Sequence, residues 1–276
     1  MAQAELPTGV DMYYEVHGEG VPVILIPGTG FSADVWRPHP VEDLQDSYQV
    51  ITFDFRGMGR STAPDAVMTV EQMAADVAEL MRHLALEPAH IIGHSIGGRI
   101  GLALSLNYPR LVRSLIMAAS GSGSAIRPGE DATPMPQHRL LKRLIERGLE
   151  EHVRVEITEN DGYFTEDFRN SNPDEVQAFY QRAWKHHADL ETYLRQVGAR
   201  HSFEATHRLP FLEVPVCVMI GSGDVAGGGA HLPASHELVK RIEGSELKVI
   251  EGCSHGFFWQ RPEETTKELK DWFSRH

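Results

Sequence analysis

The stretch Gly93-His94-Ser95-Ile96-Gly97-Gly98 is a Gly-x-Ser-x-Gly pentapeptide between two different hydrophobic patterns. Residues 89–92 before it are predicted to form a short buried strand, and residues 99–106 after it an apolar helix. A serine on so tight a strand-to-helix turn adopts a strained backbone conformation that exposes its hydroxyl above the sheet edge. Glycines are needed around it because side chains would collide with the neighbouring strand and helix. The helix also directs its free N–H groups and positive dipole end toward whatever the serine attacks. The stretch therefore predicts a nucleophilic Ser95.

The rest of the chain alternates between short apolar strands and amphipathic helices. Thr69 and Gln72 form a predicted capping box before a helix over residues 70–86, and Pro262 is predicted to begin a last helix. Predicted strands cover residues 10–17, 21–26, 48–53, 111–118, 214–220 and 247–250. This alternation predicts an α/β protein with a mostly parallel central sheet and helices on both faces.

The character of the sequence changes between residues 122 and 208. This segment is charged, helical and poor in strands, and aromatic and histidine side chains are frequent in it. We predict a core domain formed by residues 1–121 and 209–276, and a helical cap (lid) inserted at 122–208. The cap would cover the carboxyl edge of the sheet, where open α/β sheets bind their ligands.

Composition excludes several classes of partner. The net charge of −13 repels phosphate backbones, so we expect no nucleic-acid partner. The two cysteines, Cys217 and Cys253, make a disulfide framework implausible. No secretory signal and no apolar stretch of membrane-spanning length are visible, so no membrane association and a cytoplasmic location are expected.

A catalytic serine needs a base, and the base needs an orienting carboxylate. Asp224 follows the predicted strand at 214–220, and His255 follows the strand at 247–250. The carboxyl ends of parallel strands lie on one edge of the sheet, so both side chains can converge on Ser95. Asp54 also stands at a strand end, but we predict that it pairs with Arg56 and ties its own loop together.

Three motifs carry a resemblance that covers essentially the whole chain. They are Gly93-His94-Ser95-Ile96-Gly97-Gly98, Asp54-x-Arg56-Gly57-x-Gly59-x-Ser61, and Ser254-His255-Gly256 following Gly221-x-x-Asp224. With them the chain resembles the α/β-hydrolase fold enzymes, and it is most similar to the capped esterase, haloperoxidase-like perhydrolase and carbon–carbon hydrolase group. In that fold the cap is inserted after the sixth strand. The order Ser, Asp, His along the chain also matches the family.

The resemblance implies a role for each matching residue. Ser95 would be the nucleophile, His255 the general base and acid, and Asp224 the group that orients His255. The oxyanion hole would use the backbone N–H groups of Ile96 and Thr29. The family usually has a His-Gly pair on the loop that carries the second donor, where this chain has Pro27-Gly28, so the histidine that normally braces this loop is missing.

Other residues have weaker signals. Gly28, Trp184 and Phe257 are assigned to the substrate pocket, whereas His94 is predicted to point to the other side of the turn and to serve packing. His138 and the pair His186-His187 lack a carboxylate or cysteine at a recognisable ligand spacing, so no metal is assigned.

These features favour a serine hydrolase that cleaves a small-molecule carboxylic ester or lactone without a cofactor, as a monomer or homodimer. A carbon–carbon hydrolase of vinylogous diketones is the nearest alternative, and a perhydrolase side activity fits the same fold. A ligand receptor that turns its signal over slowly is an alternative from another class.

Overall fold

The structure, a computed structural model, describes residues 2–86, 88–123, 137–226 and 231–276. The described strands form one sheet of eight strands in the order β1-β2-β4-β3-β5-β6-β7-β8. From β4 to β8 all neighbours are parallel, whereas β1 and β2 are antiparallel to their neighbours at one edge. The strands are β1 (Ala2–Glu5), β2 (Asp11–His17), β3 (Val21–Ile26), β4 (Tyr48–Phe53), β5 (Ala89–His94), β6 (Val112–Ala118), β7 (Val216–Gly221) and β8 (Glu246–Ile250).

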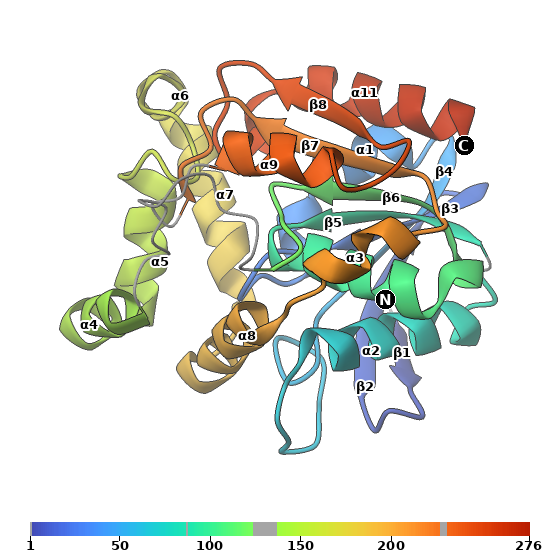
Figure 1. Ribbon diagram of the computed structural model, residues 1–276. Helices are drawn as coiled ribbons and strands as arrows, with labels where there is room; N and C mark the ends of the chain where they lie inside the picture. Colours follow the sequence, from blue (N-terminus) through green and yellow to red (C-terminus); the bar gives the residue numbers. More distant parts are fainter. Residues whose placement is uncertain (1, 87, 124–136, 227–230) are drawn as a thin grey trace.

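Helices cover both faces of this sheet, as predicted (Figure 1). One face packs against α2 (Val70–His83) and α3 (Ile96–Asn107), and the other against α1 (Val41–Leu44) and α11 (Pro262–Arg275). Successive residues of β3 alternate between the two faces: Ile24 and Ile26 belong to one buried cluster, and Val23 and Leu25 to the other. Both faces are therefore apolar, which is why the central strands are continuous hydrophobic runs.

The local signals for helix ends are confirmed. Thr69 and Gln72 make both hydrogen bonds of a capping box, and Pro262 is the first residue of α11. Strand β1 was not predicted, because only Ala4 of its four residues is buried. The strand lies at the exposed edge of the sheet, so no alternating apolar pattern marks it.

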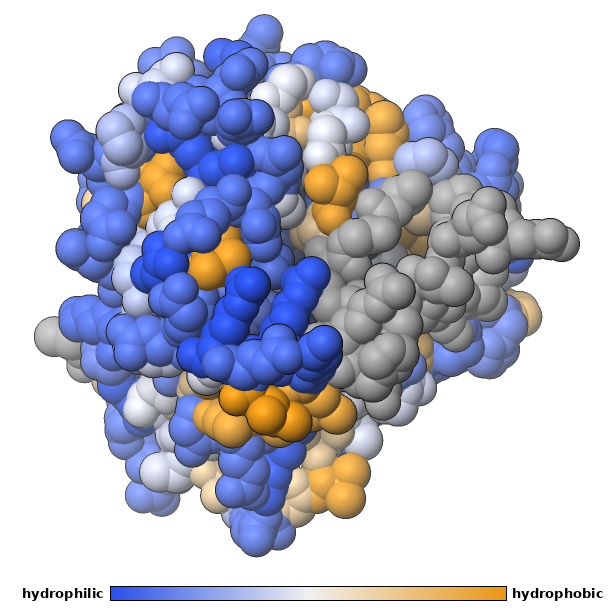
Figure 2. Space-filling model, turned by 90° about the vertical axis from the view of Figure 1, so that its left-hand side faces the viewer, coloured by the Kyte–Doolittle hydropathy of each residue, from blue (hydrophilic) through white to orange (hydrophobic). Residues whose placement is uncertain are grey.

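A set of helices between β6 and β7 forms a separate layer, shown in yellow and green tones on one side of Figure 1. Residues 137–202 contain α4 (Gln137–Arg147), α5 (Leu149–Thr158), α6 (Glu166–Ser171), α7 (Pro173–Lys185) and α8 (Leu190–Ser202). We call these five helices and the segments that join them the helical layer. No strand occurs in its described residues. The surface on this side of the molecule is mostly hydrophilic, with separate hydrophobic spots (Figure 2).

Two 3-10 helices adjoin the layer. One, η1 (Ala33–Trp36), follows β3 and packs against α7, and the other, η3 (Thr206–Phe211), leads from α8 to β7. Two further helices, α9 (His231–Val239) and α10 (Phe257–Gln260), stand before and after β8. Within the described ranges, no helix is both long enough and apolar enough to span a bilayer.

Candidate active site

Ser95 occupies the sharp turn between β5 and α3. Its backbone has φ 56° and ψ −118°, a conformation that costs a residue with a side chain roughly 1–3 kcal/mol. The turn is held by hydrogen bonds, since the Ser95 N–H donates to the Ala118 carbonyl at 2.9 Å and the Ser120 hydroxyl donates to the Ser95 carbonyl at 2.6 Å. A Cβ atom on Gly97 would overlap the backbone of Ile26 in β3. Glycine is therefore required there, because helix and strand approach so closely.

Asp224 and His255 meet at the carboxyl ends of β7 and β8. Asp224 Oδ2 lies 2.8 Å from Nδ1 of His255, and the other carboxylate oxygen accepts the Ala226 N–H at 3.0 Å. Burial by itself would raise the pKa of Asp224, but the rings of His255 and His231 and the Ala226 N–H outweigh it, so the pKa is lowered. A carboxylate that binds Nδ1 selects the imidazole tautomer whose Nε2 has a free lone pair. This geometry suits a proton acceptor.

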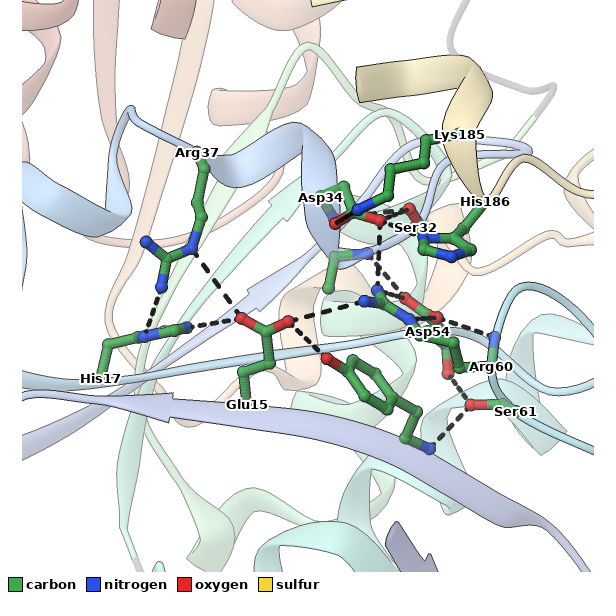
Figure 3. Close-up of polar contacts among 12 residues, drawn as sticks. Glu15, His17, Ser32, Asp34, Arg37, Asp54, Arg60, Ser61, Lys185 and His186 are labelled. Carbon is green, nitrogen blue, oxygen red and sulfur yellow. Dashed lines mark hydrogen bonds and ion pairs between the residues drawn. The ribbon is translucent and has the colours of Figure 1, made fainter. Parts of the chain in front are cut away.

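The other strand-end acid, Asp54, is fully buried and occupied elsewhere. Its oxygens accept hydrogen bonds from Nε of Arg60 at 2.7 Å and from the Ala33 N–H at 2.8 Å (Figure 3). The predicted Asp54–Arg56 pair is wrong: Arg56 instead makes two hydrogen bonds, at 2.6 and 2.7 Å, with Asp76 of α2. Asp54 faces η1 whereas Arg56 extends to α2, so neighbours in sequence bind partners in different parts of the fold.

A polar cluster beside Asp54 joins the core to the helical layer. Asp34 of η1 binds Arg60 at 3.3 Å from the core side, and His186 at 2.6 Å and Lys185 at 3.9 Å from the end of α7 (Figure 3). Burial would raise the pKa of Asp34, but the hydrogen bond from His186 and the charge of Arg60 lower it overall. Asp34 is thus an ionised junction between the two parts.

The His94 side chain packs against the loop that follows β8 and carries His255 (residues 251–256, the histidine loop). The predicted packing role agrees with this position, whereas the predicted direction, to the other side of the turn, is wrong. The His94 ring centroid is 4.6 Å from that of His255, and its Nε2 lies 3.0 Å from the His255 carbonyl oxygen, to which it donates in the neutral tautomer. Burial lowers the pKa of His94 to about 3, which keeps the ring neutral. An uncharged ring packed here supports the backbone of His255 without adding a second positive charge beside it.

The loop after β3 runs next to the serine. A Cβ atom built on Gly28 would lie 3.6 Å from Cβ of Ser95. In the part of the chain that the structure describes, neither the Thr29 N–H nor the Ile96 N–H has a hydrogen-bond acceptor, and the buried Thr29 hydroxyl has no partner. The loop thus comes close to Ser95 at Gly28, and two backbone donors, one on this loop and one next to Ser95 in α3, have no acceptor in the described residues.

The predicted pocket residues lie in different surroundings. Trp184 is half-buried and stacks on His187, with 5.1 Å between the ring centroids. Phe257 has no exposed surface and stacks on Phe258 in the core, so the structure does not support its assignment to a pocket wall.

The histidines that we considered as metal ligands do not share one site. His186 binds Asp34, whereas Nδ1 of His187 lies 2.8 Å from the Ala188 carbonyl oxygen. The side chain of His138 lies outside the described residues. Among the described residues, no group of three or more His, Cys, Asp or Glu side chains is placed to hold a metal ion.

The helical layer also contacts the histidine loop, which the sequence did not indicate. The Ser254 hydroxyl donates to the Asp161 carbonyl at 2.6 Å, and the Gly256 N–H donates to the Tyr163 carbonyl at 2.7 Å. The Tyr163 ring lies 5.8 Å from that of His255. Tyr163 is one of many aromatic residues in its segment, and no spacing distinguishes it from the others.

Comparison with known proteins agrees with this arrangement. Residues 21–262 match the family described as alpha/beta hydrolase fold. An Azorhizobium caulinodans protein named "Putative carbamate hydrolase RutD" is 30% identical over 255 residues, which cover 90% of this chain and 89% of that protein. The chain therefore belongs to the alpha/beta hydrolase fold family.

Solved structures share the same architecture. An enol-lactonase from Burkholderia xenovorans LB400 superposes with a TM-score of 0.84 at 24% identity, covering 99% of this chain and all of that one. A thermophilic esterase from Thermogutta terrifontis gives a TM-score of 0.82 at 23% identity, covering 100% and 99% of the two chains. At these identities the superpositions show a common fold.

Proposed function

We propose that this protein is a serine hydrolase that cleaves a small-molecule carboxylic ester or lactone through an acyl-enzyme intermediate. One observation carries the proposal: the 2.8 Å hydrogen bond between His255 and Asp224, on the sheet edge where the strained turn exposes Ser95. The buried Asp224 carboxylate, with its lowered pKa, binds Nδ1 of a histidine rather than a permanently charged arginine, and this is the pairing that orients a general base.

In the proposed reaction Ser95 attacks, His255 moves the protons, and Asp224 stabilises His255. His255 Nε2 takes the proton of the Ser95 hydroxyl as its oxygen attacks the carbonyl carbon, and Asp224 stabilises the imidazolium that forms. His255 then donates that proton to the leaving alcohol. Water enters, His255 deprotonates it, and the acid product leaves with Ser95 restored.

The negative oxygen of the tetrahedral intermediate needs donors that are already oriented. We propose that the N–H groups of Ile96 and Thr29 supply them: Ile96 follows Ser95, Thr29 follows Gly28, which lies against Ser95, and neither N–H has an acceptor in the described residues. Losing one such donor typically lowers kcat by about 10²–10³-fold.

We further propose that the helical layer acts as a cap over this site and selects the substrate. Trp184 and Gly28 stay assigned to the substrate pocket on this view. The cytoplasmic location and the monomeric or homodimeric state also stay predictions from the sequence.

A Ser95→Ala variant tests the assignment. It should retain the fold and lose hydrolysis of p-nitrophenyl acetate and butyrate, together with labelling by a fluorophosphonate probe. Ser105→Ala is a matched control, because Ser105 is a buried serine of α3 that bonds only within its own helix. Equal turnover by wild type and Ser95→Ala would refute the proposal.

A second candidate follows from the relative that is named as a carbamate hydrolase. A carbamate carbonyl accepts the same serine attack, so the same residues would serve. A panel of an aryl ester, a lactone, an aryl carbamate and a vinylogous diketone distinguishes these substrates from the carbon–carbon alternative. Turnover slower than about once a minute on all of them, against a usual range of roughly 1–10³ s⁻¹, would favour the receptor.

A further inference from the structure

Gly30, which follows Thr29 directly, is bound to the helical layer through both of its backbone polar groups. Its N–H donates to Oε1 of Gln196 at 2.7 Å, and its carbonyl accepts the Ala188 N–H at 2.9 Å. Both partners lie more than 150 residues further along the chain, on or just before α8. The loop proposed to carry the second oxyanion donor is therefore held from the layer.

The side chain of Gln196 is itself fixed. It is fully buried, and its Nε2 lies 3.2 Å from the sulfur of Met58 on the core loop after β4. Because the carbonyl oxygen of the amide must face the Gly30 N–H, its NH₂ group must face the sulfur. One turn earlier in α8, Thr192 donates to the Gly57 carbonyl at 3.1 Å, which fixes the helix against the same core loop.

The loop after β3 depends on contacts from other parts of the fold, because its own glycine-rich sequence allows many backbone conformations. Gly28 and Gly30 flank Thr29, and Gly30 has φ +78°, so glycine supplies the conformation without imposing it. Within the loop, the Phe31 N–H donates to the Gly28 carbonyl at 3.2 Å. That turn bond holds the peptide that carries the Thr29 N–H, and Gln196 and Ala188 hold the next two peptides of the loop through the two polar groups of Gly30.

We propose that Gln196 is a positioning residue for the oxyanion loop. This inference rests on the proposed function. On this view, a side chain of the helical layer fixes the peptide next to the one that carries the Thr29 N–H, and so limits how far that N–H can turn.

A Gln196→Met variant tests this proposal, since methionine has the length and shape of glutamine but replaces the amide oxygen by a methyl group, and its sulfur, one atom further back, is only a weak acceptor. Displacing a donor by a fraction of an ångström to 1 Å should lower kcat by about 10- to 100-fold and leave KM within about twofold. Affinity for a trifluoromethyl ketone, which forms a tetrahedral oxyanion on the serine, should fall by the same factor. Hydrogen exchange at the Gly30 amide should accelerate.

Thr192→Val is the matched control, because it removes a partly buried hydrogen bond that the same helix makes to Gly57, on the loop after β4 rather than on the oxyanion loop. It should destabilise the protein to a similar extent and keep kcat and ketone affinity within twofold of wild type. If Gln196→Met does not fold, Gln196→Asn, one methylene too short to reach Gly30, provides the same comparison. Wild-type kcat and ketone affinity in a folded Gln196 variant, or equal losses in Thr192→Val, would overturn the inference.

The proposed function is judged separately in the same assay. If Ser95→Ala is as active as wild type, the serine mechanism fails whatever Gln196 does. If Ser95→Ala is inactive and the Gln196 variants are fully active, only the positioning role fails.

Discussion

The sheet edge and the helical layer contribute to the candidate site in different ways. On the sheet edge, Ser95 follows β5 directly, and Asp224 and His255 stand in the short loops after β7 and β8, so the strands set their approximate positions. The helical layer contributes long-range contacts: Gln196 and His186 bind the segment after β3, at Gly30 and Asp34, and Tyr163 binds the loop after β8 at Gly256. Under the proposed function, the first region would supply the reacting groups by topology, and the second would hold the loops next to them. The proposed reaction would then depend on a region whose residues have no motif.

Asp224→Asn tests the sheet-edge side of this comparison and should have the largest effect. An amide in place of the carboxylate selects the wrong tautomer of His255, so kcat should fall by about 10³–10⁴-fold while KM changes little. Steady-state kinetics on an aryl ester measure this. A loss of less than tenfold would mean that another carboxylate orients His255.

Asp54→Ala is the opposite case, at the end of β4. Removing this buried acid leaves the backbone N–H groups of Ala33 and Arg60 without an acceptor and takes one carboxylate from the Arg60 guanidinium, which keeps Asp34, so the free energy of unfolding should fall by about 3 kcal/mol. The folded fraction should keep a kcat close to wild type. Urea unfolding together with active-site titration separates the two effects, and a large drop in kcat per titrated site would place Asp54 in the catalytic machinery.

Acid sensitivity tests whether sheet and layer unfold together. Burial lowers the pKa of His90 on β5 to about 4, so between pH 6.5 and 4 the unfolded chain binds a proton that the folded one does not. Stability is therefore complete above pH 6.5 and falls with decreasing pH, by at most about 1.4 kcal/mol per pH unit for this group. His90→Asn, which cannot titrate, should reduce the slope of the unfolding free energy between pH 7 and 5.

His187 in the helical layer provides the second half of that experiment. Burial lowers its pKa to about 4 as well. If the layer unfolds with the sheet, His187→Asn should also reduce the slope of the single unfolding transition. An effect of His90→Asn without any effect of His187→Asn would show that the layer opens by itself at low pH.

Trp184→Ala should have the smallest effect. Trp184 stacks on His187 and touches none of the reacting groups, so kcat should stay within about threefold. KM for bulky esters should change relative to KM for acetate, because a pocket wall acts on substrate shape. Unchanged relative KM values across acyl chain lengths would remove Trp184 from the pocket.

The sequence was most informative where local chemistry decides the structure. The glycines around Ser95 mark a turn that only glycine permits, and continuous apolar runs mark strands buried on both faces, so fold class and strand ends could be predicted. The same reasoning failed for Arg56, because the choice between Asp54 and Asp76 depends on where α2 packs. Gln196 could not be found at all, since a glutamine on a helix carries no signal until its partner 166 residues away is known.

The junction at Asp34, together with the bonds at Gly30 and Ser254, also constrains how such a protein could be recombined. A chimaera that received its α4–α8 segment from another family member would keep every strand and the whole Ser-Asp-His set. It would nevertheless lose the partners of Asp34 and Gly30 unless the donor segment happened to supply equivalents. Crossover points placed only at the two ends of that segment would therefore give folded proteins whose loops at Asp34 and Gly30 are no longer held. The loop residues that match the donor segment have to be transferred with it.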